Sequence, residues 1–151
     1  MNLGKKSLIP ILFLVVAFAG TWAPVSAQAP PPPKYAYVAN WNDNMVSAYR
    51  IDANTGGLTS IGTFPTGNGG VAGNGPAAVA VDGTGSCVFV ANFLSNNVSA
   101  YKVTPITGAL THVNGSPFPA GTGPLGVSVD PFTTDLVYVA NALDRDRKSV
   151  V

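Results

Sequence analysis

The 151-residue chain contains no glutamate, one cysteine and one histidine. Only 10% of its residues are charged, whereas an average domain has about 25%. The single cysteine excludes an intramolecular disulfide and a zinc site built from cysteines, and the single histidine leaves little room for a histidine-ligated metal. With 8 basic and 7 acidic residues and no basic cluster, the chain also lacks the charge pattern of a nucleic-acid-binding protein.

Glycine, proline and apolar residues are abundant instead. The chain has 17 glycines and 13 prolines, which argue against a helical bundle because both residues destabilise helix interiors. Its apolar content of 46% is too high for a disordered protein. The composition therefore favours a small all-β structure.

The first 27 residues have the pattern of a secretory signal peptide. Two lysines precede an apolar run over residues 8–19, and small residues follow at 25–27. The run is shorter than the roughly 20 residues that a membrane-spanning helix needs, although an uncleaved anchor is the alternative. We expect cleavage after Ala27 and a secreted or periplasmic protein without a membrane span. Residues 28–34 then form a proline-rich linker.

An internal repeat organises the rest of the chain. Residues 35–61 (YAYVANWNDNMVSAYRIDANTGGLTSI) align without a gap with residues 87–113 (CVFVANFLSNNVSAYKVTPITGALTHV), and a third copy begins at Leu136 as LVYVAN. Before the second and third copies, a Gly-Pro pair leads into AAVAVD (77–82) and LGVSVD (125–130). Such self-similarity at a period near 50 residues is typical of repeat architectures.

Each complete repeat contains four short β runs, which in the second copy lie at 77–82, 87–92, 97–103 and 109–113. Valine, tyrosine and phenylalanine dominate them, and Gly- and Asn-rich turns connect them. Runs such as CVFVA are apolar on both faces, so each sheet should pack between two others. This pattern predicts four-stranded antiparallel blades of a β-propeller, with a β-sandwich as the alternative.

These residues resemble the YVTN-type, lactonase-like (6-phosphogluconolactonase-like) family of seven-bladed β-propellers. The resemblance rests on the repeated tetrapeptides YVAN (37–40), FVAN (89–92) and YVAN (138–141), supported by VSAY and TGxLT motifs. It implies a lactonase that hydrolyses sugar-type lactones. The alternative is a non-catalytic extracytoplasmic propeller that binds a ligand or an extracellular protein through its loops.

The repeat predicts a propeller fragment of about two and a half blades over residues 35–141. Blade one covers 35–62, blade two 77–113 and the start of blade three 125–141. Blade one lacks its innermost strand, which the C-terminal end of a complete protein would supply. Residues 142–151 do not match the repeat, and we expect 146–151 (DRKSVV) to be read-through of a sequencing adapter, with a basic surface tail as the alternative. We expect the fragment itself to be inactive.

The sequence offers no complete catalytic set, and the catalytic residues stay unknown. His112 could act as a general base, but its place in the outermost strand favours a surface or edge-strand residue. Asn40, Asn92 and Asn141 each end a second strand, which favours turn caps that bond the backbone over a binding role. Asp82 and Asp130 could serve acid–base chemistry or bind a cation, but their matching positions favour turn initiation.

The remaining candidates also have structural interpretations. Cys87 occupies the repeat position that Tyr35 and Leu136 occupy in the other two copies. We therefore expect it to be a small buried apolar residue rather than a nucleophile. The glycine-rich stretch 66–75 lacks a phosphate-binding motif and is better interpreted as a loop between blades. This loop and residues 115–124 are the most plausible binding surface. No motif predicts a cofactor or a metal site.

Overall fold

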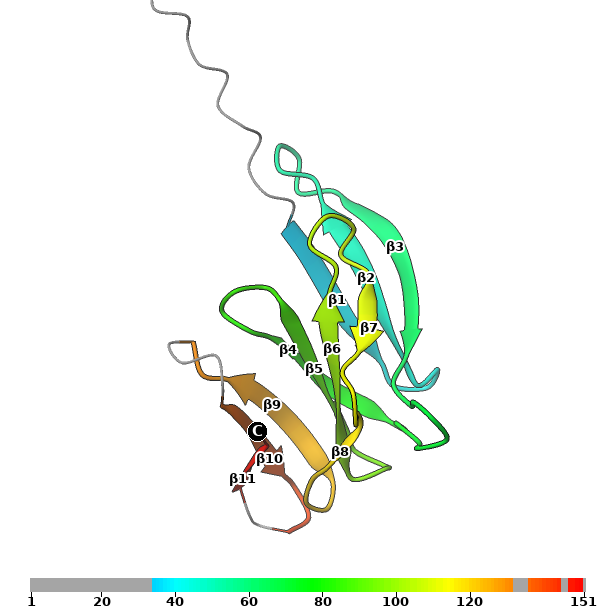
Figure 1. The fold of residues 1–151 in the computed structure, drawn as a ribbon, viewed down its shortest axis with the longest axis vertical. Coiled ribbons are helices and arrows are strands. Elements are labelled where there is room, and N and C mark those ends of the chain that lie inside the picture. Colours follow the sequence, from blue (N-terminus) through cyan, green and yellow to red (C-terminus); the bar gives the residue numbers. More distant parts are fainter. Residues whose placement is uncertain (1–33, 132–135, 145–146, 151) are drawn as a thin grey trace, which may run out of the picture. The chain divides into compact units, whose positions relative to one another are not determined.

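The computed structural model describes residues 34–131, 136–144 and 147–150. The chain divides into two compact units, Met1–Pro30 and Pro31–Val151, and the described residues all belong to the second. They form only strands and turns, which confirms the predicted all-β class (Figure 1). The predicted signal peptide and most of the proline-rich linker lie outside the described residues. No helix in the described part of the chain could cross a membrane.

Sheet one follows the first repeat. It consists of β1 (Lys34–Asn40), β2 (Met45–Ile51) and β3 (Leu58–Pro65), paired antiparallel in the order β1-β2-β3. β3 extends beyond the expected end of the blade at residue 62 and pairs with β2 over its whole length, with one irregularity at Ala48 and Tyr49. The described part of sheet one has no strand on the other edge of β1. The segment 29–33, which bears on that prediction, is not described.

Sheet two contains β4 (Pro76–Val81), β5 (Cys87–Asn92), β6 (Asn97–Val103), β7 (Leu110–His112) and β8 (Phe118–Pro119). The order is β4-β5-β6-β7, and β8 also pairs with β6. The outer strand, expected as one run over 109–113, is therefore split in two. The cause is visible in the sequence: TFP at 63–65 matches PFP at 117–119 with two more residues intervening, and the extra length forms a loop between β7 and β8.

Sheet three contains β9 (Pro124–Val129), β10 (Val137–Asn141) and β11 (Arg147–Val150), in the order β11-β10-β9. The repeat motif fails after Asn141, and we expected the blade to stop at its second strand. That expectation is wrong, because β11 pairs antiparallel with β10 and occupies the place of the VSAY strand. Ladder pairing uses backbone groups, so a strand can form there without the motif's side chains.

The three sheets pack face to face, as the doubly apolar strands predicted. One core lies between sheets one and two and joins Val46 to Val88, Val90 and Tyr101. A second core lies between sheets two and three and joins Val98 to Val137 and Val139. Each fully buried valine contributes about 1.5–3 kcal/mol relative to an exposed one. Alternate residues of β5 and β6 thus serve two different cores, which is the arrangement of consecutive propeller blades.

Candidate functional site

One end of the sheets collects the β1–β2 and β5–β6 turns together with the connections between sheets; we call it the loop end. Backbone hydrogen bonds hold these segments together. Phe93 N donates to Gly75 O at 2.8 Å, and Leu94 N donates to Asn74 O at 3.1 Å. The same pattern recurs at the next junction, where Ala142 N donates to Gly123 O at 2.8 Å.

The turns at the loop end are built on two asparagines with left-handed backbones. Asn44 has φ of 54° and Asn96 has φ of 56°, a conformation that asparagine tolerates better than most residues. Asn44 Oδ1 accepts a hydrogen bond from Gly75 N, and Asn96 Oδ1 accepts one from Gly123 N, both at 2.9 Å. Each asparagine therefore ties a turn of one sheet to the start of the next. Neither asparagine stood out in the sequence, although both occupy equivalent positions of the repeat.

The two loops predicted as a binding surface lie next to each other. Asn68 Nδ2 in the first loop donates to Ser116 O in the second at 3.1 Å. The hydroxyl of Thr66, which is fully buried, lies between the carbonyl oxygens of Asn44 and Gly73 and shares its one proton with them. The predicted surface is therefore a hydrogen-bonded unit at the junction of sheets one and two.

Several backbone N–H groups of the glycine-rich loop already bond within the protein. Asn68 N and Val71 N donate to each other's carbonyl oxygens at 3.0 Å. Asn74 N donates to Ser95 Oγ at 2.8 Å, and Gly75 N is held by the asparagine described above. Because these donors are already used within the protein, they are not presented to a phosphate group. This agrees with the interpretation of the stretch as a loop between blades.

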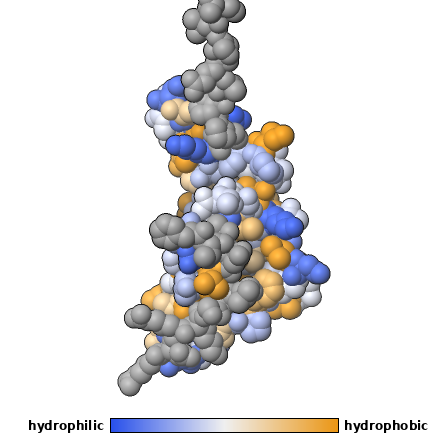
Figure 2. Space-filling model, turned by 60° about the vertical axis from the view of Figure 1, so that its left-hand side comes forward, coloured by the Kyte–Doolittle hydropathy of each residue, from blue (hydrophilic) through white to orange (hydrophobic). Residues whose placement is uncertain are grey.

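An aromatic pair is exposed at the loop end. Trp41 is 42% exposed, and its ring centroid lies 5.6 Å from that of Phe93. Leu94 and Leu143, at equivalent places in sheets two and three, are 61% and 63% exposed. Hydrophobic residues reach the surface at several separate places on the face drawn in Figure 2. The aromatic pair was not singled out by the sequence, because Trp41 and Phe93 align in one column but differ in residue type.

Charge is distributed unevenly between the two ends. The lysine and arginine residues whose side chains the structure describes are Lys34, Arg50 and Lys102, and their strand positions lie at the end opposite the loops. The loop end carries Asp43 and Asp144, and Asp144 Oδ2 accepts a hydrogen bond from Thr122 N. Among these described side chains, no basic group stands at the loop end to bind a phosphate.

Both ring nitrogens and one ring face of His112 contact other residues of the protein. Its Nε2 lies 3.0 Å from Pro65 O, its Nδ1 lies 3.3 Å from Ser116 Oγ, and its ring packs on Tyr101 with centroids 4.4 Å apart. A carbonyl oxygen only accepts, so Nε2 carries the proton and Nδ1 accepts from the serine. Burial lowers the pKa of this imidazole. β7 is the outer strand of its sheet, as expected, but the ring is half-buried against sheet one.

The repeated asparagines bond side chains rather than backbone, which corrects the turn-cap interpretation. Asn40 Nδ2 donates to Ser47 Oγ at 2.7 Å, and Asn92 Nδ2 donates to Ser99 Oγ at 2.7 Å. The partner is the serine of the VSAY motif on the adjacent strand. Among the described residues, neither amide atom of Asn141 has a hydrogen-bond partner. The register places Lys148 where the serine stands in the other sheets.

Asp82 forms a turn, as its repeat position indicated. Its carboxylate accepts hydrogen bonds from Ser86 N at 2.7 Å, Cys87 N at 2.9 Å and Thr84 Oγ1 at 2.6 Å. In the next sheet Asp130 N donates to Leu136 O at 2.9 Å, which corresponds to the bond from Asp82 N to Cys87 O. The two aspartates therefore occupy matching hairpins in separate sheets.

Cys87 lies on β5 as a half-buried free thiol. Burial raises its pKa, and the nearby Asp82 carboxylate acts in the same direction, so the thiol form is favoured. The side chain lines a pocket of about 230 Å³ together with Phe89, Val98 and Phe118. This is the environment of a packing residue rather than of an activated nucleophile. In the described part of the chain, no three His, Cys, Asp or Glu residues group closely enough to hold a metal ion.

Comparison with solved structures identifies the arrangement. The chain is similar to a proposed 6-phosphogluconolactonase from Bacteroides fragilis, with a TM-score of 0.67 and 24% identity over 77% of this chain and 31% of that one. It is also similar to a Lactobacillus plantarum protein (TM-score 0.67, 25% identity, 76% of this chain and 33% of that one). A third similar structure is the periplasmic gluconolactonase of Pseudomonas aeruginosa (TM-score 0.66, 23% identity, 76% and 31%).

The chain spans about a third of the length of these proteins. A search of curated proteins found no match. The family described as lactonase, 7-bladed beta-propeller, matches residues 26–146, which include all three sheets up to the end of β10. The stacked sheets, the repeat and this match agree, and the chain therefore belongs to the lactonase family of seven-bladed β-propellers.

Proposed function

We propose that this chain is part of an exported lactonase whose loop end binds and hydrolyses a neutral sugar-type lactone. The observation that carries the proposal is the family match over residues 26–146. The similarity to a Pseudomonas aeruginosa protein named as a periplasmic gluconolactonase supports the substrate class, and the signal-like N-terminus supports export. In such a reaction water adds to the lactone carbonyl, the ring C–O bond breaks, and a hydroxy acid forms.

The loop end supplies features that suit an uncharged sugar ring. The exposed face of Trp41, held by Phe93, offers an apolar platform for the C–H face of such a ring. The described lysine and arginine side chains lie at the opposite end, and Asp43 stands beside the platform in sequence. The described residues of this end include the carboxylates of Asp43 and Asp144, which repel a negatively charged phosphate group, so we propose that the substrate lacks a phosphate.

The experiment compares two substrates on a complete propeller that carries these three sheets. Hydrolysis releases acid, which is followed by titration at constant pH with glucono-1,5-lactone and with its 6-phosphate. We expect faster turnover of the neutral lactone, and no turnover by residues 28–151 alone, which supply only part of the ring. A preference for the phosphorylated substrate would contradict the proposed substrate class.

A non-catalytic binding propeller is the second candidate. It is favoured by the environment of His112, because both ring nitrogens already have partners in Ser116 Oγ and Pro65 O. If the complete propeller binds sugar lactones in a calorimetric titration but releases no acid, the binding function replaces the hydrolase.

A further inference from the structure

The chain contains three Asn-Gly pairs, and all of them lie among the described residues. Asn68-Gly69 and Asn74-Gly75 belong to the loop between sheets one and two, and Asn114-Gly115 lies between β7 and β8. In such a pair the backbone nitrogen of the glycine can attack the side-chain amide carbon of the asparagine, because glycine has no Cβ to hinder the approach. The structure gives the three pairs different surroundings.

The Asn74-Gly75 pair is held at its reacting nitrogen. Gly75 is buried, and its N–H donates to Asn44 Oδ1 at 2.9 Å. Asn74 N donates to Ser95 Oγ at 2.8 Å, and Asn74 O accepts from Leu94 N at 3.1 Å. The glycine nitrogen can attack only after its bond to Asn44 has opened, and this opening slows the reaction.

The Asn68-Gly69 pair is held at its side chain. Asn68 Nδ2, the group that would leave as ammonia, donates to Ser116 O at 3.1 Å. The backbone N–H groups of Asn68 and Val71 donate to each other's carbonyl oxygens at 3.0 Å and close a tight turn around the two intervening glycines. These bonds restrain the rotation that would bring the side-chain carbon of Asn68 to the nitrogen of Gly69.

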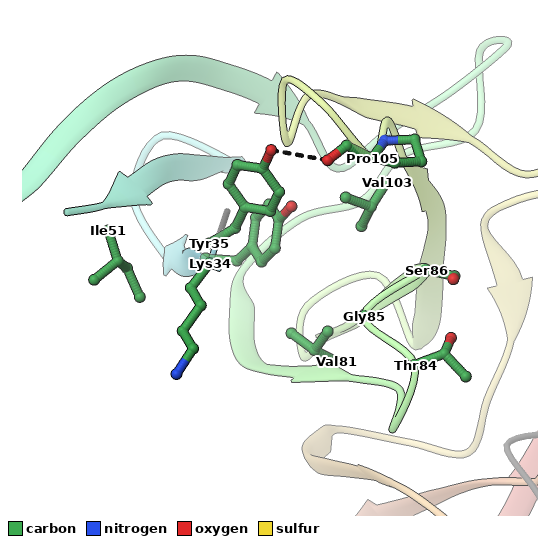
Figure 3. A pocket seen from close by; sticks show the side chains of 10 residues that line it. Lys34, Tyr35, Ile51, Val81, Thr84, Gly85, Ser86, Val103 and Pro105 are labelled. Atoms are coloured by element: carbon green, nitrogen blue, oxygen red, sulfur yellow. Dashed lines mark hydrogen bonds between the residues drawn. The ribbon is translucent and has the colours of Figure 1, made fainter. Parts of the chain in front are cut away.

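The Asn114-Gly115 pair has neither restraint. Both residues are exposed, and neither one forms a hydrogen bond within the described part of the chain. Their turn is closed by a bond between its flanking residues, from Ser116 N to Val113 O at 3.0 Å. The turn between β6 and β7 differs, because Tyr35 OH of sheet one donates to Pro105 O there at 3.0 Å (Figure 3). Asn114 can therefore rotate without losing a bond of its own.

We propose that Asn114 is the principal site at which this protein deamidates spontaneously. Gly115 N attacks Cγ of Asn114, a C–N bond forms, and Nδ2 leaves as ammonia together with the proton of the glycine nitrogen. Water then opens the cyclic imide at either of its carbonyl carbons. One opening gives aspartate, and the other gives isoaspartate, in which the backbone runs through the former side chain. Water is the only co-reactant.

The product changes a loop that contacts two other segments. Either acid places a negative charge in the turn, and isoaspartate also lengthens its backbone. Ser116 follows directly, and its Oγ accepts from Ala100 N at 2.9 Å while its carbonyl oxygen accepts from Asn68 Nδ2 at 3.1 Å. We therefore expect isoaspartate at position 114 to weaken the contact between the two loops at the junction of sheets one and two.

The test follows all three pairs in one sample of the complete propeller that carries these sheets. The protein is incubated in mildly alkaline buffer, and peptide mapping by mass spectrometry assigns aspartate and isoaspartate to each site. We expect deamidation at Asn114 to be about tenfold faster than at Asn74, because opening one hydrogen bond at Gly75 N corresponds to a factor of that size in rate. In urea, where the fold is lost, the three pairs should react at similar rates.

Asn44→Gly provides the matched variant. It removes the acceptor of Gly75 N without leaving a Cβ atom in the left-handed backbone conformation. We expect deamidation at Asn74 to become several-fold faster while the rate at Asn114 stays unchanged. An unchanged rate at Asn74 would contradict the protection by this hydrogen bond.

Three results with the unmodified propeller would overturn the proposal. The first is deamidation at Asn68 or Asn74 that is as fast as at Asn114 in the folded protein. The second is the same ranking in urea, because local sequence rather than the fold would then determine it. The third is an intact Asn114 in the folded protein over the time in which the urea sample reacts. Should Asn44→Gly fail to fold, the comparison of folded and unfolded unmodified protein decides alone.

Discussion

Asn44 Oδ1 accepts a 2.9 Å hydrogen bond from Gly75 N and thereby joins the first turn of sheet one to the entrance of sheet two. Its carbonyl oxygen accepts a second bond, from Thr66 N at 3.0 Å. Asn96 repeats both contacts one sheet later, with Gly123 N and Ala120 N. One residue type in one backbone conformation therefore joins each of the first two sheets to the next one.

Replacing this asparagine separates its two contributions. Asn44→Ala removes the oxygen that accepts the hydrogen bond from Gly75 N. It also leaves a residue with a Cβ atom at φ of 54°, where no side-chain hydrogen bond offsets the backbone strain. We expect a loss of about 2 kcal/mol, from backbone strain and one hydrogen bond together. Asn44→Gly relieves the strain and should cost about 1 kcal/mol. Urea denaturation measures both, with Asn42→Ala in the same exposed turn as the neutral control; equal losses for alanine and glycine would contradict the strain argument.

His112 makes stability depend on pH. Burial lowers the pKa of the folded imidazole below its ordinary value of about 6.5. The unfolded chain therefore binds more protons in this range, and the free energy of unfolding falls as the pH drops through about 6.5. His112→Gln should flatten the dependence between about pH 7.5 and pH 5. Parallel slopes for the two chains would show that the ring is not held neutral.

The buried serine of the VSAY motif stabilises sheet two. Ser99 Oγ accepts from Asn92 Nδ2 at 2.7 Å and donates to Thr66 O at 2.5 Å, and Ser99 is fully buried. Ser99→Ala leaves a buried carbonyl oxygen without this donor, so we expect a loss of about 1–3 kcal/mol. Ser47→Ala is the matched control, because its partner Asn40 is only half-buried and can bond water. Denaturation of both variants should rank Ser99→Ala as the more damaging.

Sheet three lacks this serine, and restoring it should help. Lys148 lies opposite Val139 in the register position that Ser47 and Ser99 occupy against Val38 and Val90. Lys148→Ser would give the buried amide of Asn141 a hydroxyl partner and stabilise β10 by about 1 kcal/mol. Slower amide exchange in β10 is the measurement. Lys148→Ala distinguishes the added hydroxyl from the removed lysine and should not slow exchange to the same extent.

The repeat predicted the strands well because the residues that pack on both faces of each sheet recur at the same positions of each copy. β5 and β6 coincide with the expected runs 87–92 and 97–103. The gapless repeat does not predict the split of the outer strand into β7 and β8, because the FP pair at 118–119 lies beyond its end at residue 113. β11 was missed because its side chains depart from the motif while its backbone still completes the ladder.

The site was harder to predict than the fold. The sequence identified both loops, but not the hydrogen bond from Asn68 to Ser116 that brings them together. It also interpreted the repeated asparagines as local turn caps, although their partners lie across the hairpin on the next strand. Residue spacing within one turn does not reveal such cross-strand partners. Aligning the columns of Ser47 and Ser99 with Asn40 and Asn92 would have suggested them.

The central claim, that the loop end of these sheets serves lactone hydrolysis, is tested most directly by the kcat/KM of the complete propeller for glucono-1,5-lactone. We expect measurable turnover and a loss of about tenfold in Trp41→Ala, since one aromatic contact contributes roughly 1 kcal/mol or slightly more. Arg50→Gln, at the opposite end of sheet one, should leave kcat/KM unchanged. Absence of hydrolysis by the unmodified propeller, or a Trp41→Ala variant as active as the parent, would contradict the claim.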